Sequence, residues 1–179
     1  MTLTPAIFLD RDNTLTIDEG FSFKVEKFQW VNGASLALNT FHKAGIPVFI
    51  VTNQGGIGRG LFTLEDMHLF HQHLRKMARS VGGEIRDIAF CPHHPLAVTK
   101  VLKTPCQCRK PEPGLLFDLA YKWQLDLRQS VMIGDRSSDV EAGQRAGCHS
   151  YLFDGIDLNR LAQQIISEHF QPNGKKYDV

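Results

Sequence analysis

The feature that most restricts the fold is an alternation along the chain between short β-rich runs and longer helical patterns. Parallel strands need long crossover connections, which are usually helices, so this alternation predicts a parallel sheet covered by helices on both faces. We therefore expect an α/β, Rossmann-like fold of three layers. The five predicted strands are residues 6–9, 48–51, 85–90, 131–133 and 150–153.

Helical patterns occupy the intervals between these runs. Apolar residues recur at 3-4 spacing from Met67 to Val81, which predicts the longest helix. Thr63 and Asp66, just before it, resemble a capping box with Asp in place of the usual Glu. Further helices are predicted at residues 34–44, 115–123, 139–146 and 158–170, and about the last eleven residues form a polar end.

Charge and composition exclude several classes of protein. The chain has 20 Lys and Arg against 19 Asp and Glu, so it lacks the cationic excess that binds a nucleic-acid backbone. No stretch approaches the ~20 apolar residues of a membrane span, and no signal-peptide pattern is present. We expect residues 1–179 to form one domain, a cytoplasmic monomer whose partner is a small molecule rather than nucleic acid or membrane.

Two carboxylates directly follow the first predicted strand. Asp10 and Asp12 stand at the carboxyl end of residues 6–9, where α/β sheets bind their ligands. The apolar residues before Asp10 mount this side chain on a buried strand, which holds it in one attack geometry. Acids after a strand also commonly cap a helix or lie in solvent, so this pair alone does not establish a site.

A phosphate-binding composition follows the second predicted strand. Thr52 offers a hydroxyl and residues 53–56 offer flexible backbone N–H groups, although turns of this composition are common. Lys110, between Arg109 and Pro111, offers a cation held in extended backbone by the proline that follows it.

A further acid, Asp135, follows the predicted strand at residues 131–133. If this strand is the neighbour of residues 6–9, Asp135 converges with Asp10 and Asp12 at the edge of the sheet. Clustered carboxylates need a counter-charge, and oxygen ligands suit Mg²⁺. The sequence therefore predicts a magnesium site at this edge.

Three of the four cysteines gather near histidines in residues 91–110, in a C-x-H…C-x-C pattern. Four nitrogen and sulfur ligands without an open position are typical of a structural Zn²⁺ site, although reduced buried cysteines are the alternative. His94 is an alternative to His93 as a ligand. Such a zinc loop would position Lys110, which follows it directly. The predicted ligands are Cys91, His93, Cys106 and Cys108.

These motifs together resemble those of the haloacid dehalogenase-like phosphohydrolases. D-x-D-x-T at residues 10–14, then Thr52, Lys110 and the Asp135…Asp139 pair match the four motifs of that family in order. From about residue 5 to 155 the chain is further similar to the heptose 1,7-bisphosphate phosphatases of the family, with the histidinol-phosphate phosphatases second. The resemblance implies the fold of that family without a separate cap domain, and it favours His93 as the zinc ligand.

The resemblance also implies a mechanism in two steps. Asp10 attacks phosphorus and forms an aspartyl-phosphate, while Asp12 protonates the departing alkoxide and then activates the hydrolytic water. Asp139 is expected to support Lys110 or the metal shell. The implied Mg²⁺ ligands are the Asp10 side chain, the Asp12 backbone carbonyl and Asp135, and the implied ligands of the phosphoryl oxygens are Thr52, the Asn53 backbone and Lys110.

Two other classes use related chemistry. Response-regulator receiver domains also form an aspartyl-phosphate on a parallel sheet, but they place the acceptor at the end of the third strand. Here that strand ends in Ala89, Phe90 and Cys91, with no acid. A third interpretation is a DNA 3′-phosphatase of the same superfamily. The near-neutral net charge argues against it, because such an enzyme must bind a nucleic-acid backbone.

Substrate selection falls to the loops, because no insertion is long enough for a cap domain. The resembled heptose enzymes bind the sugar at residues 18–21, and their N-Q-S-G-I-A-R-G loop matches residues 53–60, including Arg59, which histidinol phosphatases typically lack. Gly55 and Gly58 replace Ser and Ala in that loop and are expected to loosen it.

The implied activity is hydrolysis of the 7-phosphate of D-glycero-D-manno-heptose 1,7-bisphosphate, in the supply of nucleotide-activated heptose for lipopolysaccharide core or a related glycan. Arg59 and Arg109 are predicted to hold the second phosphate. Arg136 stands where histidinol enzymes also carry Arg, and it favours that alternative. The predicted substrate-binding residues are Asp18, Glu19, Gly20, Phe21, Asn53, Gln54, Gly55, Arg59, Arg109 and Arg136.

Overall fold

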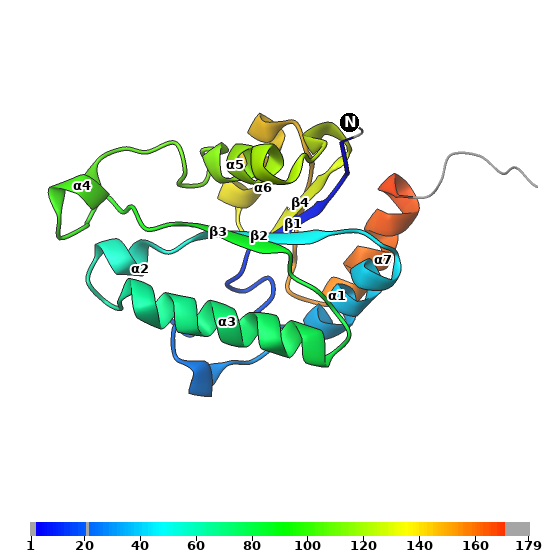
Figure 1. Cartoon of the computed structure of the whole chain (residues 1–179), viewed down its shortest axis with the longest axis horizontal. Helices are drawn as coiled ribbons and strands as arrows, with labels where there is room; N and C mark the ends of the chain where they lie inside the picture. Colours follow the sequence, from blue (N-terminus) through cyan, green and yellow to red (C-terminus); the bar gives the residue numbers. More distant parts are fainter. Residues whose placement is uncertain (1–2, 21, 171–179) are drawn as a thin grey trace, which may run out of the picture.

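A computed structural model describes residues 3–20 and 22–170, so Phe21 and the predicted polar end from residue 171 lie outside the described residues. Five parallel strands form one sheet in the order β3-β2-β1-β4-β5 (Figure 1). The strands are β1 (Ile7–Leu9), β2 (Val48–Asn53), β3 (Asp87–Cys91), β4 (Val131–Gly134) and β5 (His149–Leu152).

The shortest strand, β1, lies at the centre of the sheet. Leu9 pairs with Ile50 of β2 on one side and with Ile133 of β4 on the other. The residues that follow these three strands therefore emerge side by side at one edge. The pairing of β1 with β4 is the condition under which Asp135 was expected to converge with Asp10 and Asp12.

Both faces of the sheet are buried against helices. Ile7 and Leu9 contribute to one core, whereas Ala6 and Phe8 contribute to the other, as the two-residue period of a strand requires. Because both sets are apolar, the strand is continuously apolar in sequence. Figure 1 shows α5 (Gly114–Trp123) and α6 (Ser137–Ala146) on one face and α1 (Ala34–Lys43), α3 (Leu64–Ser80) and α7 (Leu158–His169) on the other.

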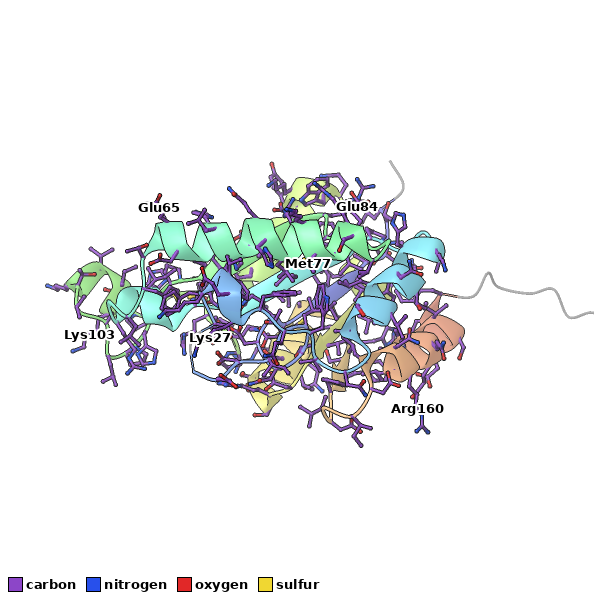
Figure 2. All side chains as sticks on the ribbon, turned by 90° about the horizontal axis from the view of Figure 1, so that it is seen from below. Lys27, Glu65, Met77, Glu84, Lys103 and Arg160 are labelled. Carbon is purple, nitrogen blue, oxygen red and sulfur yellow. The ribbon has the colours of Figure 1, made fainter. Side chains whose placement is uncertain are left out.

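The predicted capping box opens α3. The N–H of Asp66 donates to the Thr63 hydroxyl at 3.0 Å, and the N–H of Thr63 donates to the Asp66 carboxylate at 2.8 Å. Two N–H groups that the helix leaves unpaired are thereby satisfied. Seen from below, α3 crosses the molecule, with Glu65 in its first turn on the same side as Lys103 (Figure 2).

Four short helices in the described part of the chain lie outside the predicted strands and helices. Elsewhere the predicted ends agree with the observed ones to within three residues; α6, for example, begins at Ser137 rather than Asp139, and β3 begins at Asp87 rather than Ile85. Among the described residues, no helix combines the length and apolarity needed to cross a bilayer. The short helices are η1 (Val25–Lys27), α2 (Gly55–Gly58), α4 (Lys100–Lys103) and η2 (Leu127–Gln129).

Candidate active site

Three carboxylates meet at the edge of the sheet where β1 and β4 end. Asp10 follows β1, and its N–H donates to the carbonyl of Ile133 at 2.9 Å, which continues the pairing of the two strands. Asp135 follows β4, and Asp139 lies in the first turn of α6. One oxygen from each of these three acids lies within 4.8 Å of the others.

A buried lysine neutralises part of this charge. The Lys110 amino group lies 2.7 Å from Oδ1 of Asp10 and 2.7 Å from Oδ1 of Asp139, and it donates to the carbonyl of Val51 at 2.7 Å. Burial alone would lower the pKa of Lys110, but the two carboxylates raise that pKa above its ordinary value. Lys110 is therefore a permanent cation, and its contact with Asp139 agrees with the supporting role expected of that acid.

Lys110 does not neutralise all the negative charge of the three carboxylates. Burial, and then the charges of Asp10 and Asp139, raise the pKa of Asp135 to about 6. Its Oδ1 atom is buried and has no hydrogen-bond partner among the described residues. An unpaired buried carboxylate oxygen beside other acids fits a hard divalent cation such as Mg²⁺, which takes oxygen ligands.

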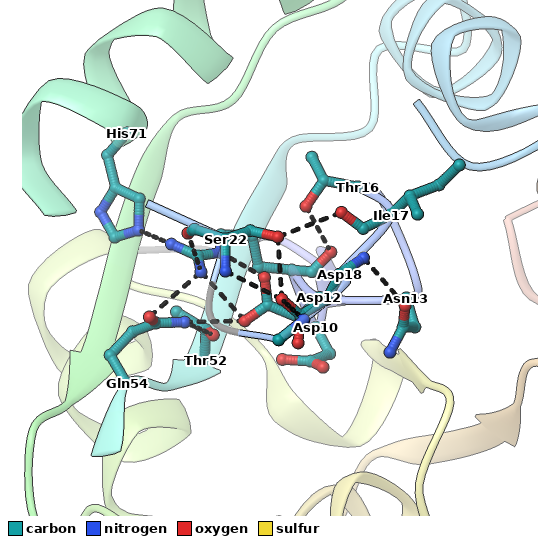
Figure 3. Close-up of polar contacts among 12 residues, drawn as sticks. Asp10, Asp12, Asn13, Thr16, Ile17, Asp18, Ser22, Thr52, Gln54 and His71 are labelled. Carbon is teal, nitrogen blue, oxygen red and sulfur yellow. Dashed lines mark hydrogen bonds and ion pairs between the residues drawn. The ribbon is translucent and has the colours of Figure 1, made fainter. Parts of the chain in front are cut away.

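The second acid of the motif, Asp12, turns away from this cluster toward a different cation. Oδ1 of Asp12 accepts from Nε of Arg11 at 2.8 Å, and Oδ2 accepts from Nη2 of Arg11 at 3.0 Å. Gln54 adds a third donor, to Oδ2, at 2.9 Å. Burial raises the pKa of Asp12 and outweighs the opposite effect of Arg11. Figure 3 shows Asp12, Gln54 and Thr52 close together beside Asp10.

The end of β2 brings Thr52 and Asn53 to the same place. Thr52 is buried, and its hydroxyl accepts from Nε2 of Gln54 at 2.8 Å. The Asn53 side chain bonds the backbone of Lys110, donating to its carbonyl at 3.1 Å and accepting from its N–H at 3.0 Å.

One cavity of about 370 Å³ unites most of the predicted site. Asp135 is not among the lining residues, although one of its oxygens lies within 4.8 Å of oxygens of Asp10 and Asp139. Glu19 lines a neighbouring hollow of about 340 Å³ instead. The lining residues are Asp10, Asp12, Asp18, Gly20, Thr52, Asn53, Gln54, Gly55, Arg59, His94, Arg109, Lys110, Arg136, Ser138 and Asp139.

The two loop glycines of α2 mark close packing rather than the expected looseness. A Cβ atom on Gly55 would lie 2.8 Å from the His94 ring and 3.1 Å from Nη1 of Arg109. A Cβ atom on Gly58 would lie 2.6 Å from the carbonyl oxygen of Pro92. The departures from Ser and Ala therefore let α2 approach the segment that follows β3.

The four predicted zinc ligands come together where the two ends of residues 91–108 meet. Sγ of Cys108 lies 3.1 Å from Sγ of Cys91, 3.4 Å from Sγ of Cys106 and 3.5 Å from Nδ1 of His93. Burial raises the pKa of the Cys91 thiol, which bound metal would oppose because metals take thiolates. Three sulfurs and one imidazole nitrogen around a common point fit tetrahedral Zn²⁺.

The two adjacent histidines point to different places. His93 belongs to the cysteine cluster, whereas His94 lines the cavity beside Arg109. Nδ1 of His94 accepts from the N–H of Leu96 at 3.0 Å, so a neutral ring carries its proton on Nε2. Sequence reasoning considered His94 only as a metal ligand and missed its place in the cavity.

Arg11 and His71 are two further residues at the site that sequence reasoning did not select. Arg11 is fully buried, and Nη1 donates to Nε2 of His71 at 3.1 Å. A signal was present in each case, because Arg11 interrupts an acid pair and His71 shares the apolar stripe of α3 with Met67 and Leu74.

Comparisons with known proteins agree with this geometry. The HAD-hydrolase-like family model matches residues 107–161. The D-glycero-beta-D-manno-heptose-1,7-bisphosphate 7-phosphatase of Rhodopseudomonas palustris is 37% identical over 164 residues, covering 92% of this chain and 91% of the relative. The enzyme of the same name from Escherichia coli K12 is 34% identical over 142 residues, covering 79% of this chain and 74% of the relative.

Two solved structures that share the fold are also similar to this chain in sequence. A HAD-like phosphatase from Mesorhizobium loti has a TM-score of 0.84 and 29% identity, covering 96% of this chain and 90% of that one. The D,D-heptose 1,7-bisphosphate phosphatase of B. bronchiseptica, complexed with magnesium and phosphate, has a TM-score of 0.81 and 28% identity, covering 92% and 99%.

Proposed function

The chain belongs to the haloacid dehalogenase-like phosphohydrolases, among relatives named heptose bisphosphate phosphatases, and on this premise we propose that it removes the 7-phosphate of D-glycero-D-manno-heptose 1,7-bisphosphate. The protein is a phosphoric monoester hydrolase. The observation that carries the proposal is the single cavity that joins Asp10, Thr52 and Lys110 to two arginines, Arg59 and Arg109.

In the first step, the Asp10 carboxylate attacks phosphorus and the bond from phosphorus to the sugar oxygen breaks. Burial raises the pKa of Asp10, and Lys110, 2.7 Å away, opposes that effect and favours the ionised nucleophile. Asp12 gives its proton to the departing alkoxide. The Thr52 hydroxyl, the Asn53 backbone and Lys110 bind the phosphoryl oxygens in the transition state.

In the second step, Asp12 accepts a proton from water as that water attacks the aspartyl-phosphate. The bond from phosphorus to Asp10 breaks, phosphate leaves and both acids return to their starting states. Asp10, the Asp12 backbone carbonyl and Asp135 would hold Mg²⁺, and Asp139 supports Lys110. When bound, the ion neutralises charge on the transferring group.

The cysteine cluster has a structural role in this proposal. Cys91, His93, Cys106 and Cys108 would hold Zn²⁺ and stabilise residues 91–110. Arg109 and Lys110 directly follow the last of these ligands, so the folded segment delivers both cations to the cavity.

Substrate choice is assigned to the rim of the cavity. Arg59 and Arg109 bind the phosphate that is not cleaved, Asp18 and Gly20 contact the sugar, and Arg136 lines the same cavity. These cations favour a bisphosphate over histidinol phosphate, which carries a positive charge. Arg136 favours the alternative substrate, histidinol phosphate, so that compound is included in the test. The rim loops take the place of a cap domain.

The protein is further proposed to act as a monomer in the cytoplasm, in the supply of nucleotide-activated heptose. The test is a panel of purified protein with Mg²⁺ against heptose 1,7-bisphosphate, fructose 1,6-bisphosphate and histidinol phosphate, with released phosphate as the readout. We expect the highest kcat/KM for the heptose bisphosphate. A higher value for histidinol phosphate would overturn the substrate assignment.

A further inference from the structure

We propose that Arg11 is a positioning residue that holds the Asp12 carboxylate for proton transfer, with His71 anchoring its guanidinium from α3. The inference rests on the proposed role of Asp12 as acid and base. It assigns a task to a fully buried arginine that the mechanism above does not use.

The guanidinium is held from several directions. Beyond its two bonds to Asp12, Nη2 donates to the carbonyl of Ser22 at 2.8 Å and to Oε1 of Gln54 at 3.1 Å. The carbon of the guanidinium lies 4.9 Å from the centroid of the Phe70 ring. His71, Gln54, Ser22 and Asp12 converge on this place from different segments (Figure 3). These contacts hold the guanidinium in one orientation, and its two bonds to Asp12 fix the orientation of that carboxylate.

His71 fixes the far side of the guanidinium. Burial, and then the charge of Arg11, lower the pKa of His71 to about 3, so the ring is neutral at physiological pH. Its Nε2 atom then accepts from Nη1 of Arg11, and its own proton lies on Nδ1. A cationic ring could not accept this bond.

The contacts also divide the two motif acids between two cations. Lys110 pairs with Asp10, whereas Arg11 pairs with Asp12. Oδ2 of Asp12 accepts two bonds, from Arg11 and Gln54, and Oδ1 accepts one. Oδ1 is therefore the oxygen with capacity left to exchange a proton at the cavity. Arg11 keeps the carboxylate directed there and away from the acids around Asp135.

The test uses the leaving group. An alkoxide needs a proton as it departs, whereas p-nitrophenolate leaves without one, and kcat/KM reports the steps up to that departure. Arg11→Lys keeps the charge but loses the planar fork. We expect kcat/KM to fall ~10²-fold for the sugar phosphate that the wild type hydrolyses in the panel above. For p-nitrophenyl phosphate we expect a fall of less than about threefold.

Three controls make the result specific. Asp12→Asn should show the same dependence on the leaving group. The double variant Arg11→Lys/Asp12→Asn should lose no more than Asp12→Asn alone, because Arg11 acts through Asp12. Arg79 is an exposed arginine on α3, so Arg79→Lys is the matched substitution. It should leave kcat/KM unchanged for both substrates.

The outcomes separate this inference from the proposed function. Equal losses on both substrates for Arg11→Lys, or additive losses in the double variant, would overturn the positioning role. No leaving-group dependence in Asp12→Asn would instead overturn the acid role of Asp12, and the inference with it. If Arg11→Lys fails to fold, His71→Phe carries the test, with the same direction and a smaller ratio; a ratio equal to that of the wild type would overturn the inference.

Discussion

Asn53 and Lys110 exchange two hydrogen bonds across 57 residues of chain, from the Asn53 amide to the Lys110 carbonyl and from the Lys110 N–H back to the Asn53 oxygen. They join the end of β2 to the segment that follows the cysteine cluster. The lysine backbone is thereby held at the distance from which its amino group reaches Asp10.

Asn53→Ala should therefore reduce kcat more than it raises KM. Removing both bonds leaves Lys110 less well placed against the transferring group, and we expect a loss of roughly tenfold or more in kcat. Steady-state kinetics at saturating Mg²⁺ provide the measurement. An Asn53→Ala enzyme with wild-type kcat would show that Lys110 is held by other contacts.

Asp10→Asn should abolish turnover and leave the fold intact. The amide fills the same space but cannot attack phosphorus, so the rate should fall by several orders of magnitude. Phosphate release and the circular dichroism melting curve should be measured on the same preparation. Retention of more than about a tenth of the rate would exclude Asp10 as the nucleophile.

Cys106→Ser should lose zinc and lower the melting temperature. Zinc bound by four ligands contributes to folding free energy, and one lost thiolate weakens every other ligand contact. Cys148→Ser, at a buried cysteine outside the cluster, is the matched control and should keep its zinc. Elemental analysis should find about one zinc per chain in wild-type protein purified without chelator; a zinc-free wild type would refute the site.

Arg59→Ala and Arg109→Ala should chiefly raise KM for heptose 1,7-bisphosphate. Contacts to the uncleaved phosphate are present in both the ground state and the transition state, so their loss weakens uniform binding. Heptose 7-phosphate lacks the second phosphate and should be affected less. Equal losses on both substrates would mean that these arginines serve the transferring group or the fold.

His71 should make the free energy of unfolding depend on pH in the acidic range. Its pKa is about 3 in the folded protein against 6.5 for an ordinary histidine, so between these values only the unfolded chain binds the proton. Stability should therefore fall as pH drops below about 6.5, by up to about 1.4 kcal/mol per pH unit. Denaturant unfolding at several pH values measures the slope.

His71→Gln should remove this contribution, and His68→Gln, at an exposed histidine one turn earlier on α3, is the control. A slope that is unchanged in His71→Gln would show that the histidine is protonated in the folded state.

The sequence alone was sufficient to predict the site residues that lie at the ends of strands. Asp10 and Asp135 follow apolar strands and Thr52 lies near the end of another, and neighbouring parallel strands bring such residues together. The pair of Arg11 and His71 was not predictable in this way, because its members are 60 residues apart and only the packing of α3 on the sheet brings them into contact.

The helix α2 was missed for a different reason. Three of its four residues are glycine, which has poor helix propensity, so local sequence argues against a helix. Its close packing against the segment containing Pro92 and His94 overrides that preference. The assignment of residues 1–179 to one domain and the catalytic roles of individual residues remain predictions.

The central place of β1 has a consequence for how the protein loses activity. Amide protons of β1 are bonded to neighbours on both sides, so their exchange with deuterated solvent requires opening of the whole sheet rather than fraying of an edge. Asp10 shares that protection through its bond to Ile133. Heating should therefore remove the nucleophile from its position only through global unfolding, whereas the rim loops open earlier and impair substrate affinity first.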